Sequence, residues 1–153
     1  MNNLLSSVLI VDDDPGIRNM LSSVLSNEGF AVETASNGKE AVKTCEKTPF
    51  DVALIDIELP DMKGTELLKK LKQIQPRIVM IIITGHPTLE SAVRAVNQSA
   101  DGYLLKPFEV VDLLEMIKRL LDEKTNEYLR ISAEIASEKE KTPTVKYQRS
   151  NRW

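Results

Sequence analysis

The chain has 153 residues, and its 42% hydrophobic content is enough to bury the core of one domain with a small appendage. Its formal net charge of -3 gives no reason to expect nucleic acid as a partner. The single cysteine, Cys45, excludes an internal disulfide and is expected to be a buried spectator thiol. No apolar run approaches the roughly 18 residues of a membrane helix, and the first residues lack the basic segment of a signal peptide. We therefore expect a cytoplasmic protein that does not bind membranes.

Five short apolar runs between residues 5 and 105 alternate with segments of helical period. This pattern predicts repeated strand–helix units and an α/β fold with a parallel sheet. The runs VALI and IVMIII are continuously apolar, as expected for interior strands that helices cover on both faces. The predicted strands cover residues 8–11, 30–34, 52–55, 78–83 and 102–105.

Local start and stop signals define the first two predicted helices. Asp14 followed by Pro15 indicates an N-cap with proline in the first helical turn, and Gly29 ends that helix. Asn37 with Glu40 resembles a capping box at the start of the second helix. These signals give Asp14 a structural role and separate it from the two aspartates that precede it.

Apolar stripes at helical spacing predict two more helices, over residues 67–74 and 89–96. A fifth helix is expected to begin near Val110. Its apolar residues keep alternating four-three spacing as far as Ile135 and are interrupted only at Lys124. This last helix is therefore expected to run well past the domain.

These patterns divide the chain into three parts. Residues 1–121 form the predicted domain, and residues 122–141 form a helical extension that is either a solvated cap or a coiled coil. Residues 142–153 contain a proline, three basic side chains and no acid, which is typical of a mobile basic tail.

Polar side chains follow the carboxyl ends of four predicted strands. Because the carboxyl ends of parallel strands face one crevice, we expect these side chains to converge. Carboxylates are the hard oxygen ligands that Mg²⁺ prefers, whereas one histidine and one cysteine offer no zinc site. An amine and a hydroxyl can bind phosphoryl oxygens, so the set indicates an aspartate that becomes phosphorylated. The converging residues are Asp12, Asp13, Asp56, Thr84 and Lys106.

The segment from about residue 5 to residue 121 strongly resembles the receiver domain of two-component response regulators. The matching stretches are LIVDDDPGIR, DVALIDIELPDMKG, IIITG and ADGYLLKPF, in the family's order and at its spacings. The resemblance implies a flavodoxin-like, doubly wound fold with five parallel strands in the order 2-1-3-4-5. It also implies five helices, of which the last is extended here.

The resemblance assigns the acidic residues to a metal and phosphorylation site. Asp56 matches the phosphoacceptor of the family. Mg²⁺ would be held by Asp13, Asp56 and the backbone carbonyl of Glu58, with Asp12 acting mostly through water.

Three further positions match the family's switch and phosphate-binding residues. Thr84 and Lys106 resemble the switch hydroxyl and the lysine that binds the phosphoryl group. Tyr103 matches the aromatic residue whose rotamer follows the threonine, and the Lys106–Pro107 bond matches one that is cis in the family.

Glu58 and His86 lie two residues past Asp56 and Thr84, respectively. In the family, these positions flank the phosphoryl group and tune the rate at which water removes it. We hypothesise that protonated His86 pairs with Glu58 across the site mouth and alters water access. The alternative is that both are exposed loop side chains.

The resemblance implies a signalling phosphoacceptor that catalyses only its own phosphorylation and dephosphorylation. Its partners would be a histidine kinase or a phosphotransfer protein, and a downstream effector that the sequence does not identify. A homodimer could form through the fourth helix, fifth strand and fifth helix, or through the extension.

Two other classes of protein remain as alternatives. A haloacid-dehalogenase-type phosphatase uses an aspartate nucleophile, and DIE places a second acid two residues after Asp56. In such enzymes, however, the nucleophile follows the first strand, whereas Asp56 follows the third predicted strand of this chain. A dinucleotide-binding domain would need G-x-G-x-x-G after the first strand, which is absent.

Overall fold

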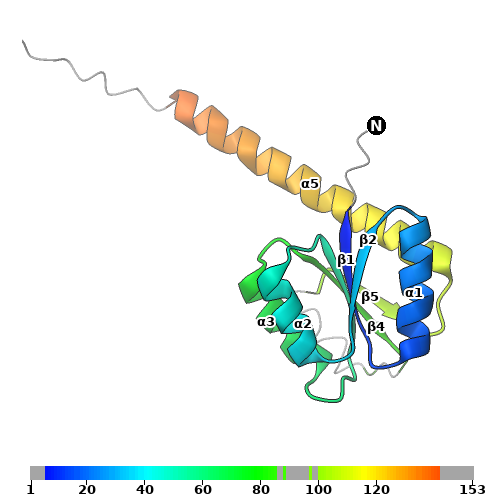
Figure 1. Ribbon diagram of the computed structural model, residues 1–153. Helices are drawn as coiled ribbons and strands as arrows, with labels where there is room; N and C mark the ends of the chain where they lie inside the picture. The colour runs from blue at the N-terminus through cyan, green and yellow to red at the C-terminus, as the bar shows by residue number, and fades with distance from the viewer. Residues whose placement is uncertain (1–5, 86–87, 89–96, 98–99, 142–153) are drawn as a thin grey trace, which may run out of the picture.

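The computed structural model describes residues 6–85, 88, 97 and 100–141. Five parallel strands form one sheet in the order β2-β1-β3-β4-β5 (Figure 1). This confirms the predicted flavodoxin-like α/β fold, and every strand end lies within one residue of its predicted position. The strands are β1 (Ser7–Val11), β2 (Ala31–Ala35), β3 (Val52–Asp56), β4 (Val79–Thr84) and β5 (Gly102–Leu105).

Helices cover both faces of the sheet, with α2 and α3 on one face and α1 and α5 on the other (Figure 1). The helix predicted over residues 89–96 lies outside the described residues, as does the tail predicted over 142–153. None of the helices in the described part of the chain has the length and apolarity needed to span a membrane. The helices are α1 (Pro15–Asn27), α2 (Gly38–Lys47), α3 (Gly64–Ile74) and α5 (Val110–Lys141).

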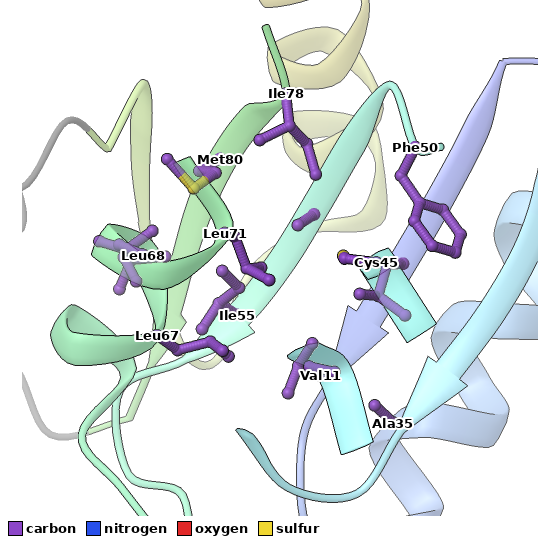
Figure 2. Close-up of a cluster of buried hydrophobic side chains, with 14 residues drawn as sticks. Val11, Ala35, Cys45, Phe50, Ile55, Leu67, Leu68, Leu71, Ile78 and Met80 are labelled. Carbon is purple, nitrogen blue, oxygen red and sulfur yellow. The ribbon is translucent and has the colours of Figure 1, made fainter. Parts of the chain in front are cut away.

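Two hydrophobic clusters lie on opposite faces of the sheet, because consecutive strand residues point in opposite directions. Leu9 and Val11 of β1 belong to the cluster beneath α2 and α3, whereas Val8 and Ile10 belong to the cluster beneath α1 and α5. Figure 2 shows the first cluster, in which side chains from α2 and α3 meet those of the strands. The central strands are buried from both sides, as their continuous apolar runs predicted.

Cys45 of α2 belongs to the cluster in Figure 2 and is only 4% exposed. Burial, helped by the negative charge of Glu33, raises the pKa of its thiol to about 11. The thiol is therefore protonated at neutral pH and is a poor nucleophile. The prediction of a buried spectator thiol is confirmed.

The predicted start and end of α1 are confirmed. The Asp14 carboxylate accepts hydrogen bonds from the N–H groups of Gly16 at 2.8 Å and Ile17 at 3.4 Å, and Pro15 opens the helix. Gly29 follows the helix with a φ of 93°, a conformation that a side chain would strain. Asp14 is therefore the N-cap residue of α1.

The start of α2 differs slightly from a capping box. The Asn37 side chain accepts a hydrogen bond from the Glu40 N–H at 2.8 Å, as predicted. The Glu40 carboxylate, however, reaches past Asn37 to the N–H and hydroxyl of Ser36, at 3.1 and 2.9 Å. The two side chains still cap the start of α2, but Glu40 accepts from the N–H group one residue before the N-cap rather than from that of the N-cap itself.

The helix α5 begins at Val110, as predicted, and its 32 residues span about 48 Å. Leu113, Ile117 and Leu120 are buried in the sheet's second cluster and fix the first part of the helix. The rest of α5 extends away from the sheet (Figure 1).

Two polar contacts join α5 to the rest of the fold beyond its buried turns. The Lys124 ammonium lies 3.4 Å from the carboxylate of Asp101, which precedes β5. The Arg77 guanidinium lies over the Tyr128 ring, 4.3 Å from its centroid. These contacts hold α5 against the rest of the fold as far along the helix as Tyr128.

Candidate functional site

The carboxyl ends of the strands bring most of the predicted site residues to one edge of the sheet. Asp12 and Asp13 follow β1, Asp56 ends β3, and Lys106 follows β5. The strand register sets these ends close together, since Val11 pairs with Ile55 and Thr84 pairs with Leu105. A cleft of about 440 Å³ opens there, and its lining includes the three aspartates, Glu58, Gly85 and Lys106.

The three aspartates form a compact acidic cluster. One carboxylate oxygen from each of Asp12, Asp13 and Asp56 lies within 4.8 Å of those of the other two. Asp12 is buried, Asp56 is half-buried and Asp13 is exposed. The three carboxylates fit Mg²⁺, because they offer hard oxygen ligands. The cluster is exposed at Asp13, so coordination positions would remain for water and a phosphoryl oxygen.

Lys106 connects two of these carboxylates. Its Nζ donates hydrogen bonds to Asp12 Oδ2 at 2.8 Å and to Asp56 Oδ2 at 3.2 Å. Burial alone would lower the pKa of the ammonium, but the hydrogen bond to Asp12 and the charges of both carboxylates outweigh it and raise that pKa. The lysine is therefore held in its charged form, next to the place where negative phosphoryl oxygens would lie.

The pKa of Asp56 is raised above its usual range, principally because the carboxyl group is partly buried. The charge of Asp12 raises it further, whereas the Glu58 N–H, which donates to Asp56 Oδ1 at 3.0 Å, and Lys106 oppose the rise. A cation at the cluster would favour the ionised form of Asp56, as an opposite charge always does.

Backbone contacts hold the loop after β1 in place. Asp12 Oδ1 accepts a hydrogen bond from the Asp14 N–H at 3.0 Å, and the Asp12 carbonyl accepts one from Arg18 Nη1 at 2.7 Å. Arg18 was not predicted from the sequence as part of this site. The one feature of the sequence that could have indicated Arg18 is its place in the first turn of α1, directly after the acid pair. This place brings its positive charge over the loop.

The loop after β3, residues 57–63, is closed at its base. The Gly64 N–H donates to the Ile57 carbonyl at 2.7 Å, and Glu58 and Lys63 form an isolated antiparallel bridge. A Cβ at Gly64 would overlap the Asp56 carbonyl, so only glycine fits this close approach. No local sequence pattern indicates that this glycine packs against the end of β3 at Asp56.

The remaining predicted residues lie outside the cleft lining or outside the described residues. Thr84 is fully buried at the end of β4, and Tyr103 of β5 is half-buried against the cluster of Figure 2. The Lys106–Pro107 peptide bond is cis. His86 lies outside the described residues, so its pairing with Glu58 stays a prediction.

Comparison with known proteins identifies the family. The family model described as "Response regulator receiver domain" matches residues 8–118. The chain belongs to this family: it is a receiver domain of two-component response regulators. The comparisons give the phosphatase alternative no support.

The curated relatives that the chain resembles include NtrC and NtrX-like response regulators. It is 41% identical over 115 residues to the DNA-binding transcriptional regulator NtrC of Escherichia coli K12, a match that covers 74% of this chain and 24% of that protein. It is 38% identical over 117 residues to a putative NtrX-like response regulator of Rickettsia bellii, covering 75% of this chain and 24% of that protein. The chain thus spans about a quarter of the length of these relatives.

Solved structures agree in fold. A CheY-like receiver domain protein from Methanospirillum hungatei JF-1 aligns with a TM-score of 0.79 and 44% identity, covering 80% of this chain and 98% of that chain. The beryllofluoride-activated NtrC4 receiver domain dimer aligns with a TM-score of 0.73 and 36% identity, covering 77% of this chain and 98% of that chain.

Proposed function

We propose that Asp56 accepts a phosphoryl group from the phosphohistidine of a histidine kinase or phosphotransfer protein in the cytoplasm, with Mg²⁺ bound at the acidic cluster. The observation that carries this proposal is the Lys106 ammonium placed between Asp12 and Asp56, beside a third carboxylate. Bound Mg²⁺ would supply charge neutralisation for the phosphoryl oxygens. Its ligands would be Asp13, Asp56 and the Glu58 carbonyl, with Asp12 acting through water.

In this reaction, an Asp56 carboxylate oxygen forms a bond to phosphorus while the phosphorus–nitrogen bond of the phosphohistidine breaks. The electron pair of the broken bond returns to the imidazole nitrogen. Lys106 moves its hydrogen bonds from the carboxylates to the phosphoryl oxygens and stabilises the charge spread over them. The short backbone contacts to Asp12 and Asp56 hold the acceptor in line, so little rearrangement is needed.

We propose that the phosphorylated state is read through Thr84 and Tyr103. The Thr84 hydroxyl donates to a phosphoryl oxygen, and Tyr103 turns inward to fill the space that the threonine leaves, which changes the surface of β5 and α5. Shifting the ratio of the phosphorylated-like conformation to the resting conformation from 1:99 to 99:1 takes roughly 5.5 kcal/mol of differential interaction energy. A few charge-assisted hydrogen bonds of about 1.5–3 kcal/mol each are enough.

The phosphoacceptor is tested by incubating the full chain with acetyl phosphate and Mg²⁺ and measuring its mass. We expect one phosphoryl group on the wild type and none on Asp56→Asn. Asp51→Asn is the matched control, because Asp51 precedes the same strand at the opposite edge of the sheet. Labelling of Asp56→Asn would contradict the assignment, and steady turnover of phosphate monoesters would favour the phosphatase alternative.

We further propose that the extension of α5 pairs two copies of this chain. Tyr128, Ile131 and Ile135 follow the alternating spacing of a coiled-coil seam and are 49%, 41% and 49% exposed. Exposed large apolar side chains in register on a projecting helix favour a helical partner. The NtrC4 receiver, one of the similar structures, is itself a dimer.

Charges beside the seam favour a parallel second copy. With Tyr128 at position a, Glu134 falls at g and Lys139 at the following e, the two positions that face each other across a parallel dimer. Each Glu134 would therefore lie beside Lys139 of the other copy. Within its own helix Glu134 contacts Arg130 at 2.9 Å, which leaves its second oxygen for this pair.

Dimerisation is tested by light scattering with and without beryllofluoride and Mg²⁺. Ile131→Asp should give a monomer, whereas Leu129→Asp should not, because Leu129 is 58% exposed at a position outside the seam. The proposed seam would be refuted if the wild type were a monomer both with and without beryllofluoride. It would also be refuted if Ile131→Asp and Leu129→Asp weakened the dimer equally.

A further inference from the structure

The loop after β3 touches more than the acidic cluster. At its far end, Asp61 accepts hydrogen bonds from two N–H groups of α2: Oδ1 from Gly38 at 2.9 Å and Oδ2 from Lys39 at 2.8 Å. The neighbouring Met62 side chain lies against Gly38, where a Cβ would overlap it. One residue of the loop therefore binds a helix end that is more than 20 positions away in the sequence.

The start of α2 needs this contact. The first N–H groups of a helix have no partner within the helix. Asn37, the N-cap, accepts a hydrogen bond only from Glu40 N–H among the first turn. Asp61 supplies acceptors for the N–H groups of Gly38 and Lys39, which precede Glu40. These hydrogen bonds, and most of all the one from Gly38, lower the pKa of the exposed Asp61 carboxyl group. The carboxylate also carries the charge that a helix N-terminus favours.

The same loop forms one wall of the cleft. Glu58, two residues past Asp56, lines that wall together with Leu59 and Pro60. The base of the loop is held by the Gly64 N–H bond to Ile57, the bridge between Glu58 and Lys63 and the Glu58 N–H bond to Asp56, and the far end is held at Asp61. Asp61 is three residues from Glu58 in this loop, so we expect the loss of its hydrogen bonds to change where the Glu58 backbone lies.

We propose that Asp61 is a positioning residue for the metal site: its two hydrogen bonds to the N-terminus of α2 hold the loop so that the Glu58 carbonyl faces the acidic cluster. This inference rests on the proposed Mg²⁺ site. Asp61 belongs neither to the acidic cluster nor to the cleft lining, so it would act only through the loop backbone.

The test compares two variants that remove N-terminal hydrogen bonds from the same helix. Asp61→Ala removes the bonds and frees the loop, whereas Asn37→Ala removes a bond and leaves the loop attached. Mg²⁺ affinity is measured by titrating MgCl₂ into the ¹⁵N-labelled chain at constant ionic strength and following its amide resonances. Thermal unfolding of both variants without metal reports the loss of stability.

We expect both alanine variants to unfold at lower temperature and only Asp61→Ala to bind Mg²⁺ about tenfold more weakly, the lower end of the loss found for other residues that orient metal ligands. Asp61→Asn separates geometry from charge, because asparagine keeps one acceptor but no charge. Its affinity should lie between those of the wild type and Asp61→Ala.

Equal loss of Mg²⁺ affinity in Asn37→Ala and Asp61→Ala would overturn the inference, and so would equal loss in Asp61→Asn and Asp61→Ala. The first would show a purely structural role, and the second an effect of charge alone. Unchanged affinity in Asp61→Ala would refute it as well. If the wild type itself bound no Mg²⁺ near Asp56, the proposed metal site would fail instead.

Discussion

Removing one negative charge from the acidic cluster should stabilise the fold while weakening the site. Asp13 is the exposed member of the cluster, and its carboxylate lies within 4.8 Å of those of Asp12 and Asp56. At that distance two like charges in water repel each other by about 0.9 kcal/mol. Asp13 meets two such charges, and Lys106 offsets roughly one of them. Asp13→Asn should therefore raise the free energy of unfolding by about 1 kcal/mol without metal.

The assay is urea denaturation at neutral pH with a chelator, at low and high ionic strength. Asp122→Asn is the matched control, because it removes an exposed aspartate from α5, far along the chain from the cluster. The gain of Asp13→Asn should shrink as salt increases, since exposed charges are screened over about 10 Å at 0.1 M. The control should show no comparable gain.

Saturating Mg²⁺ should reverse the order of stability. A ligand that binds only the folded state stabilises it in proportion to the logarithm of its concentration over its dissociation constant. The wild type, with all three carboxylates, should gain more than Asp13→Asn. If Asp13→Asn is no more stable than the wild type without metal, the carboxylates do not repel each other as their spacing implies.

Three further perturbations have defined outcomes. Gly64→Ala should destabilise the fold by about 1–3 kcal/mol in urea unfolding, because its Cβ would overlap the Asp56 carbonyl. Asp14→Ala should cost about 1 kcal/mol in the same assay, as for other N-caps. The raised pKa of Cys45 predicts a loss of stability between pH 9 and 11, since the thiol ionises at lower pH in the unfolded chain than in the fold. Urea unfolding at both pH values should show a smaller loss in Cys45→Ala, and an equal loss would contradict the pKa.

The sequence predicted those features whose partners lie close along the chain or follow from sheet geometry. Asp14 and Asn37 cap helices that begin at the next residue, so local spacing was enough. The acidic cluster followed from the rule that parallel strands end at one edge. Asp12 and Asp56 are 44 residues apart, but each directly follows or ends a strand.

Contacts between distant segments could not be predicted in this way. Gln75 illustrates the reason: its amide donates to the carbonyls of Cys45 and Thr48 and accepts from the Phe50 N–H. It thereby closes the end of α2 from a position after α3. Such bonds depend on how two helices pack, and no local spacing encodes that packing. Asp61 belongs to the same class.

The interruption of the apolar pattern at Lys124 has a physical explanation in the contacts of α5. Lys124 and Tyr128 both contact the rest of the domain, through Asp101 and Arg77. Asp101 also accepts a hydrogen bond from the Met80 N–H at 2.8 Å, so this contact is tied to the start of β4. Tyr128 is still 49% exposed beside Arg77, so it is both the last residue docked on the domain and the first residue of the seam that can bind a second copy.

A seam from Tyr128 to the end of α5 at Lys141 holds only two heptads. Isolated helical segments of about 12–15 residues or fewer are marginal in water, so this seam alone should give a weak dimer. A stable dimer then needs additional surface next to the helix, and the proposed switch alters that surface at β5 and α5. Beryllofluoride should accordingly strengthen the dimer, whereas an interface confined to the extension would be insensitive to it. Dimer dissociation constants with and without beryllofluoride distinguish these two cases directly.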